Sequence, residues 1–308
     1  MQIKNSFFLK IFALVFAFSL AQSSAHAREL IDQVGRSVNV PEEPRRIVSL
    51  MPSVTEMVYD LGAGDLLVGA TLYATFPPEA LSLPRVGSYN HLDVEKIVRL
   101  QPDLCLAVRD GNPIHIVDKL VALGVPVFVL DPRTLEEIKE SVFLLGRALG
   151  MEKNAAIIAV DMDRRLAAID NTVKLARFSP KVFFQIDAAP IISAGSNTFI
   201  DRLIVRAGGI NMASGPKPYP RFSWEDILKM QPELVIIASM AGGHTTEELK
   251  AGWEKWPQIP AVKNNRLYVV DADLFDRPIP RLIDGLERLL EILHPELKST
   301  AISKHQTQ

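Results

Sequence analysis

Short apolar runs alternate with amphipathic segments along most of the chain, which is the pattern of an α/β protein. A hairpin is predicted ahead of them at residues 30–40, turning at Gly35. Uninterrupted apolar runs of this length are typical of parallel strands covered on both faces. The predicted buried strands are 46–50, 104–108, 125–130, 182–186, 234–238 and 267–270.

Polar residues mark where helices begin between these strands. Residues 53–56 and 134–137 have the spacing of capping boxes, and the first predicts a helix that ends near Gly62. Asn112-Pro113 predicts another helix start, and residues 280–293 form an amphipathic closing helix.

One ten-residue pattern occurs twice. Residues 95–104 and 225–234 share E-x-I-x-x-x-Q-P-[DE]-L at an offset of 130 residues. Both copies predict a short helix, a proline break and a buried strand. A single repeat at this spacing predicts two similar lobes rather than a solenoid. A chance match is the alternative.

A long helix is predicted at residues 151–178, between the two halves. It contains no Gly or Pro and would be about 42 Å long. One apolar face repeats at helical spacing: Ile158, Met162, Leu166, Ile169 and Val173. We therefore expect one rigid connecting helix and small relative motion of the lobes. An ordinary packed helix that says nothing of motion is the alternative.

The N-terminal segment, residues 1–27, reads as a secretory signal peptide. Lys4 and Lys10 precede or flank an apolar run at 11–20, and residues 25–27 form a small-x-small cleavage site. That run is too short to span a bilayer. We expect cleavage and export to a periplasm; a retained anchor is the alternative. The predicted division is then an N-terminal lobe at 28–150, the connecting helix at 151–178, a C-terminal lobe at 179–298 and a flexible tail at 299–308.

Composition excludes several classes of protein. A length of 308 residues with 48% hydrophobic and 23% charged residues fits two folded lobes. The net charge of −2 provides no basic field for nucleic acid. Cys105 is the single cysteine, so an intramolecular disulfide and thiolate-cluster metal sites are excluded. Its apolar neighbours predict an inert core residue.

Enzyme signatures are missing from the sequence. There is no G-x-S-x-G elbow, phosphate-binding loop or H-E-x-x-H motif, and the histidines lack metal-ligand spacing. We expect a protein that is not an enzyme and carries no cofactor or metal. A secreted enzyme whose catalytic residues converge from distant positions remains the alternative.

Loop residues from both halves are the candidate ligand contacts. Tyr73, Tyr89 and Tyr219 lie in predicted loops, where their flat faces suit a large, partly apolar, planar ligand. Asp273 and Arg277 follow the last strand and could bind ligand amides or carboxylates. The alternative for the tyrosines is that they only pack loops against the body of the protein. The alternative for Asp273 and Arg277 is a surface ion pair.

Two glutamates of the repeat, Glu95 and Glu225, are the candidate docking residues. Asp93 and Ser223 are predicted N-caps, which places both glutamates in a first helical turn. They either complement the helix dipole or offer one carboxylate per lobe to arginines of a symmetric membrane partner.

These features resemble the periplasmic substrate-binding proteins of bacterial metal-chelate ABC importers. The likeness runs from residue 45 to 296 and is carried by residues 46–56, by Tyr73 with 77–78, and by 273–281. It implies two α/β lobes joined by one long helix, with cobalamin, heme or an iron–siderophore bound between them.

Residue by residue, the likeness is greatest to the cobalamin-binding members. Tyr73 matches a tyrosine that contacts the corrin, whereas Tyr89 and Tyr219 fall where those members have tryptophans. Val108 falls at a third such tryptophan. Heme-binding members are distinguished by a tyrosine at the position where this chain has Ser88. The resemblance thus implies cobalamin first, and heme or a ferric siderophore second.

The same resemblance assigns roles to the charged candidates. Asp273 and Arg277 match polar ligand contacts of the cobalamin-binding members. Glu95 and Glu225 match docking glutamates that engage arginines of an inner-membrane ABC permease. We expect a monomer that delivers a corrinoid to that permease.

Overall fold

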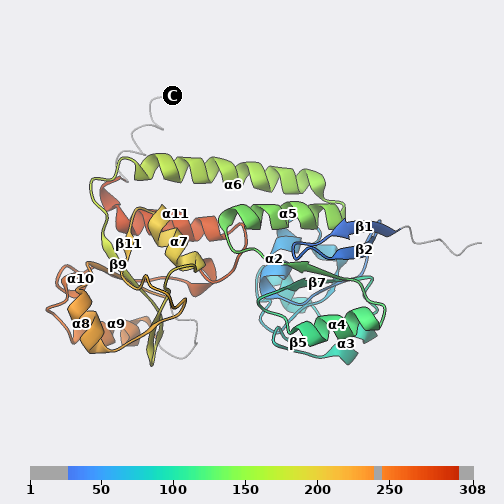
Figure 1. The fold of residues 1–308 in the computed structure, drawn as a ribbon, viewed down its shortest axis with the longest axis horizontal. Coiled ribbons are helices and arrows are strands. Elements are labelled where there is room, and N and C mark those ends of the chain that lie inside the picture. Colours follow the sequence, from blue (N-terminus) through green and yellow to red (C-terminus); the bar gives the residue numbers. More distant parts are fainter. Residues whose placement is uncertain (1–26, 239–244, 298–308) are drawn as a thin grey trace, which may run out of the picture.

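Two α/β lobes lie side by side under one long helix in the computed structural model, which describes residues 27–238 and 245–297 (Figure 1). The predicted fold class is therefore confirmed. The signal segment up to residue 26 and the tail 299–308 lie outside the described residues.

The N-terminal lobe has a parallel four-stranded sheet in the order β4-β3-β7-β8. Its strands are β3 (Ile47–Ser49), β4 (Leu67–Gly69), β7 (Leu104–Val108) and β8 (Val127–Leu130). Its helices are α2 (Pro52–Asp60), η1 (Gly64–Leu66), η2 (Pro78–Ser82), α3 (Val94–Arg99), α4 (Ile114–Ala122) and α5 (Leu135–Leu149). Two antiparallel pairs flank the sheet: β1 (Ala27–Ile31) with β2 (Ser37–Pro41), and β5 (Gly87–Ser88) with β6 (His91–Leu92).

The C-terminal lobe has a mixed sheet in the order β12-β10-β9-β13-β14, with β11 beside β9. Its strands are β9 (Lys181–Ala188), β10 (Ile191–Ser193), β11 (Ile210–Asn211), β12 (Arg221–Phe222), β13 (Leu234–Ile237) and β14 (Leu267–Val269). Its helices are α7 (Phe199–Arg206), α8 (Trp224–Met230), α9 (Thr246–Glu254), α10 (Pro260–Lys263), η3 (Ala272–Leu274), α11 (Leu282–Leu293) and η4 (Pro295–Leu297). Strands β9, β11, β13 and β14 run parallel to one another. Strand β10 pairs antiparallel with β9 on one side and with β12 on the other.

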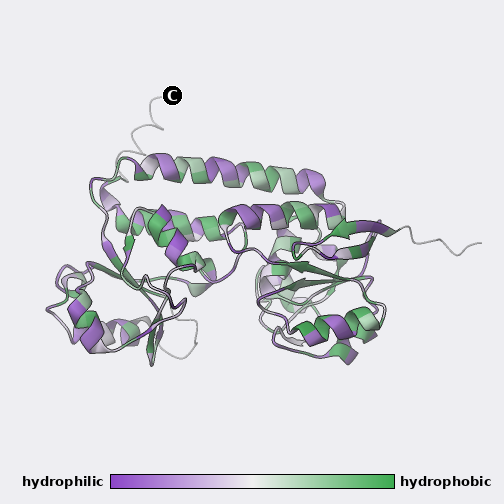
Figure 2. Ribbon diagram, in the orientation of Figure 1, coloured by the Kyte–Doolittle hydropathy of each residue, from purple (hydrophilic) through white to green (hydrophobic). Residues whose placement is uncertain are grey.

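Apolar cores cover both faces of each sheet, as the uninterrupted apolar strands predict. In the first lobe one core lies under α2 and α5 and the other under α3 and α4. In the second lobe the cores lie under α6, α7 and α11 and under α8 and α9. Figure 2 shows apolar residues concentrated along the strands.

The repeated sequence forms the same structure in both lobes. After α3 and α8, Gln101 and Gln231 adopt left-handed φ angles of 49° and 51° and stop the helix. The following carboxylates then accept backbone N–H groups at the start of the neighbouring strand. Asp103 binds the N–H of Arg46 at 3.1 Å, and Glu233 binds that of Lys181 at 2.9 Å. The repeat therefore encodes a helix stop and a link between strands.

The connecting helix α6 runs from Glu152 to Val173 and lies over α5 of one lobe and α11 of the other (Figure 1). Its 22 residues span about 33 Å, so it is shorter than the predicted 151–178. Beyond Val173 the chain tightens, because the N–H groups of Leu175 and Ala176 bind carbonyls three residues back. Ion pairs fix α6 to both lobes: Lys139–Asp163 at 2.6 Å and Arg165–Glu287 at 2.6 Å.

Three predicted helix starts are wrong by one or two residues. Helix α2 begins at Pro52 with Met51 as a cap that makes no side-chain bond, so the capping box at 53–56 does not form. The reason is that Ser53 is buried inside the helix, and Glu56 pairs with the other lobe. Helices α4 and α11 begin one and two residues late, at 114 and 282.

The second predicted cap forms in part. Thr134 caps α5 by accepting the N–H of Glu137 at 3.1 Å. The carboxylate of Glu137 instead accepts the N–H of Arg133, at 2.6 Å.

The lobes are also joined by the segment between η3 and α11. Ile279 belongs to this segment, yet its side chain is buried in the core of the N-terminal lobe beneath α2 and α5. The C-terminal lobe therefore inserts an apolar residue into its neighbour, which opposes separation of the lobes at this point.

Candidate functional site

Two of the predicted tyrosines lie together on the N-terminal lobe. The ring centres of Tyr73 and Tyr89 are 6.0 Å apart and their planes are inclined by 58°. Tyr73 follows β4 and is 55% exposed, and half-buried Tyr89 occupies the turn between β5 and β6. The pair therefore leaves aromatic surface accessible rather than filling the core.

The loops that carry these rings are held by residues that sequence reasoning missed. Arg85 Nη1 donates to the carbonyls of Thr71 and Ala74, at 2.8 and 3.0 Å, and so brackets Tyr73. Nothing in the sequence near Arg85 marks this role.

The Tyr89 turn is anchored from below by Asn112. The buried Asn112 amide donates to the carbonyls of Tyr89 and Leu50, at 3.0 and 2.7 Å. Gly87 precedes the turn with φ 105°, and a Cβ there would lie 2.4 Å from the His91 carbonyl. The Asn-Pro pair at 112–113 predicted a helix start, which gave no sign of this contact with Tyr89.

Tyr219 lies on the C-terminal lobe and is 61% exposed. Its loop is fixed on both sides, because Gly195 N–H binds the Pro218 carbonyl at 2.8 Å and Ser193 N–H binds that of Pro220 at 3.1 Å. Loss of water and the negative charge of Asp110 raise the pKa of Tyr219. Asp110 follows β7 of the other lobe, so Tyr219 lies within electrostatic range of the N-terminal lobe, and its hydroxyl is neutral at neutral pH.

Asp273 and Arg277 form the ion pair that the sequence left as one alternative. Arg277 Nη2 lies 2.8 Å from Asp273 Oδ2. Arg277 also reaches Glu56 Oε2 of the other lobe at 3.5 Å, and Arg281 donates to the same carboxylate from Nε and, at 3.1 Å, from Nη2. The pair is thus part of a network between the lobes, and Glu56 is a member that the capping-box interpretation misassigned.

Asp60 lies near this network at the end of α2. Asp60 is exposed, yet partial loss of water, together with the charge of Glu56, raises the pKa of Asp60 to about 6, and Arg281 opposes the shift. The pKa of Asp60 is higher in the folded state than in the unfolded state. Its contribution to stability is therefore fully present below the unfolded-state pKa and is lost as the pH rises through 6.

Asp60→Asn should therefore raise the melting temperature by about 1–2 °C at pH 7.5, with the gain shrinking toward zero at pH 4. Thermal unfolding at both pH values measures this. Asp118→Asn, an exposed change on α4, is the control. An equal gain at both pH values contradicts the assignment.

Glu95 and Glu225 are exposed in the first turns of α3 and α8, and Asp93 and Ser223 cap these helices as predicted. Glu225 pairs with Lys229 at 2.8 Å. Both helices lie on the side of the molecule opposite α6 (Figure 1). One flat partner could therefore contact both.

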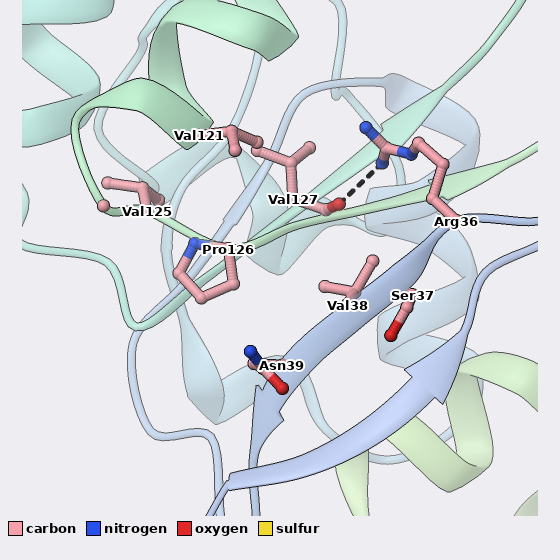
Figure 3. A pocket seen from close by; sticks show the side chains of 9 residues that line it. Arg36, Ser37, Val38, Asn39, Val121, Val125, Pro126 and Val127 are labelled. Atoms are coloured by element: carbon pink, nitrogen blue, oxygen red, sulfur yellow. Dashed lines mark hydrogen bonds between the residues drawn. The ribbon is translucent and has the colours of Figure 1, made fainter.

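A surface hollow of about 400 Å³ lies apart from the predicted site residues (Figure 3). It is bounded by β2 and by the turn from α4 into β8. Arg36 donates to the Val127 carbonyl at 2.8 Å and to Asp32 at the same distance. These bonds occupy polar groups at the edge of the sheet, so the hollow adds nothing to the candidate ligand site.

Cys105 lies buried in β7, where loss of water raises its thiol pKa, as expected of an inert core residue. Across 27–238 and 245–297, no three His, Cys, Asp or Glu side chains gather as a metal site requires. In the same ranges no helix combines the length and apolar character needed to cross a bilayer.

Comparison with known proteins shows the family to which the chain belongs. Residues 47–274 match the family described as periplasmic binding protein, and the chain belongs to it. A vitamin B12-binding protein of Vibrio cholerae is 32% identical over 258 residues, which cover 82% of this chain and 90% of that protein.

Solved structures agree on the fold and differ in ligand. The periplasmic vitamin B12-binding protein BtuF of Vibrio cholerae has a TM-score of 0.73 at 30% identity, covering 82% of this chain and 98% of that one. The periplasmic heme-binding protein RhuT of Roseiflexus sp. RS-1 has a TM-score of 0.72 at 27% identity, covering 82% and 99%. The protein is therefore a periplasmic binding protein of the kind that includes B12 and heme binders.

Proposed function

We propose that this protein captures cobalamin between its lobes. Tyr73 and Tyr89 contact the corrin from the N-terminal lobe, Tyr219 contacts it from the C-terminal lobe, and Asp273 and Arg277 bind its peripheral groups. The single observation that carries the proposal is the accessible Tyr73–Tyr89 pair, whose ring centres are 6.0 Å apart. The protein performs no reaction and carries no cofactor.

The charge around the polar half of the site favours a corrinoid over heme. Asp271, Asp273 and Asp276 lie near one another in a segment that also carries Arg277, and Arg281 lies within electrostatic range of Asp271 and Asp273. Carboxylates accept hydrogen bonds from the amide side chains of a corrin and repel the propionates of heme. The likeness to a heme-binding protein keeps heme, or a ferric siderophore, as the second candidate.

We further propose delivery to an inner-membrane ABC permease through Glu95 and Glu225, with the protein acting as a monomer in the periplasm. Cleavage after residue 27 would release the mature chain, with lobes at 28–150 and 179–298, the connecting segment at 151–178 and a flexible tail at 299–308. The family supports the periplasm, and the exposure of both glutamates supports the docking role.

Calorimetric titration of residues 28–308 with cyanocobalamin, and with hemin in parallel, tests the ligand. We expect one-to-one binding of cyanocobalamin with a dissociation constant of about 1 μM or less. Binding of hemin alone would overturn the corrinoid assignment and leave the transport role. If neither cyanocobalamin nor hemin gives a binding heat, other metal chelates become the candidate ligands.

A further inference from the structure

Glu56 is a buried carboxylate whose partners come from the opposite lobe. Its side chain is 1% exposed, and Arg277 and Arg281 pair with it. Among the described residues no hydrogen bond from its own lobe reaches this carboxylate. A buried charge without a partner is strongly unfavourable, so Glu56 holds both arginines in place.

Each arginine continues to a different half of the proposed ligand site. Arg277 bridges Glu56 and Asp273, with 2.8 Å to the latter. Arg281 lies over the ring of Phe76, with its guanidinium carbon 4.4 Å from the ring centre. Phe76 belongs to the same loop as Tyr73. One carboxylate therefore supports the polar half through Arg277 and the aromatic half through Arg281.

We propose that Glu56 is the positioning residue of the ligand site, which acts through Arg277 and Arg281 and touches no ligand itself. This inference rests on the proposed binding function. The planar guanidinium groups suit the role, because their fixed donors transmit the orientation of the carboxylate to what they contact.

A double-mutant cycle separates positioning from mere stability. Glu56→Gln should weaken cyanocobalamin binding about tenfold. Added to Arg277→Gln, it should cause much less further loss, because both changes break one chain of contacts. Added to Tyr219→Ala, on a loop outside this network, its effect should multiply in full. Full multiplication with Arg277→Gln, or unchanged affinity of Glu56→Gln, would overturn the proposal.

Arg165→Gln is the matched control, because Arg165 on α6 likewise pairs with two carboxylates, Asp284 and Glu287. It should lower the melting temperature and leave the affinity unchanged. An affinity loss equal to that of Glu56→Gln would reduce Glu56 to a general stabilising residue. If Glu56→Gln does not fold, Arg281→Lys replaces it, and unchanged affinity there would also overturn the proposal.

A ligand-free measurement keeps this test separate from that of the function. Hydrogen exchange is followed in the apo protein over residues 71–76 and 271–279. Glu56→Gln should accelerate exchange in both segments and not in β7. Acceleration in one segment alone overturns the two-armed role, whether or not the wild type binds cyanocobalamin or hemin. If neither cyanocobalamin nor hemin binds but Glu56→Gln accelerates exchange in both segments, the ligand assignment is overturned and the positioning role of Glu56 stands.

Discussion

Cells that carry Glu95→Arg together with Glu225→Arg should lose cobalamin uptake, while the purified variant binds cyanocobalamin as tightly as the wild type. Both side chains are exposed, and the helices that carry them, α3 and α8, lie on the side of the molecule opposite α6 (Figure 1). Reversing both charges would set cations against the arginines that the proposed docking assigns to the permease, and like charges at an interface are strongly unfavourable. Uptake of labelled cobalamin and calorimetry measure the two quantities.

The fold should survive these changes, because a first-turn charge contributes only about 0.3–1 kcal/mol. Glu136→Arg with Glu152→Arg is the matched control. These glutamates also lie exposed in first turns, on α5 and α6, away from α3 and α8. The control variant should transport normally. Equal loss of binding and uptake in the Glu95 and Glu225 variant would show that these residues act on the ligand and not on docking.

Tyr219→Ala should weaken ligand binding by about 1–3 kcal/mol, or roughly 5- to 150-fold, because the change removes a flat apolar face from the site. Tyr219→Phe keeps the ring and should retain most of the affinity. The hydroxyl is neutral at pH 7, since the pKa of Tyr219 is raised, so its loss removes no charge. Titration calorimetry of the two variants measures the difference.

Phe178→Ala controls for loss of an aromatic ring as such. Phe178 is a similarly exposed aromatic side chain that contacts His294, near the far end of α6. Its truncation should leave the affinity unchanged. If Tyr219→Ala binds as tightly as the wild type, Tyr219 does not belong to the site, and the ligand is held by the N-terminal lobe and the Asp273 segment.

The sequence predicted local structure closely wherever a residue's environment follows from its neighbours in the chain. The buried strands 104–108 and 234–238 lie within one residue of β7 and β13. The helix caps at Asp93 and Ser223 form as predicted, and Thr134 caps α5 without the reciprocal bond of a capping box. Strand burial and capping depend on a few consecutive residues, so period and spacing reveal them.

The candidate site was predictable as a set of residue types and not as a geometry. The three tyrosines could be placed in loops, but the 6.0 Å approach of Tyr73 and Tyr89 depends on Arg85 and Asn112, which are remote from the rings that they support. Asp273 and Arg277 were found because they are near each other in the chain.

Glu56 shows where local reasoning stops. In the sequence its spacing from Ser53 fits a capping box, a contact within one helical turn. In the structure its partners are Arg277 and Arg281 of the other lobe, which are 221 and 225 residues away along the sequence. The chain thus specified its strands, its caps and its two-lobed repeat locally. The pairing of Glu56 with Arg277 and Arg281 was decided by packing between the lobes, because a buried charge takes its partner from whichever segment tertiary contacts bring beside it.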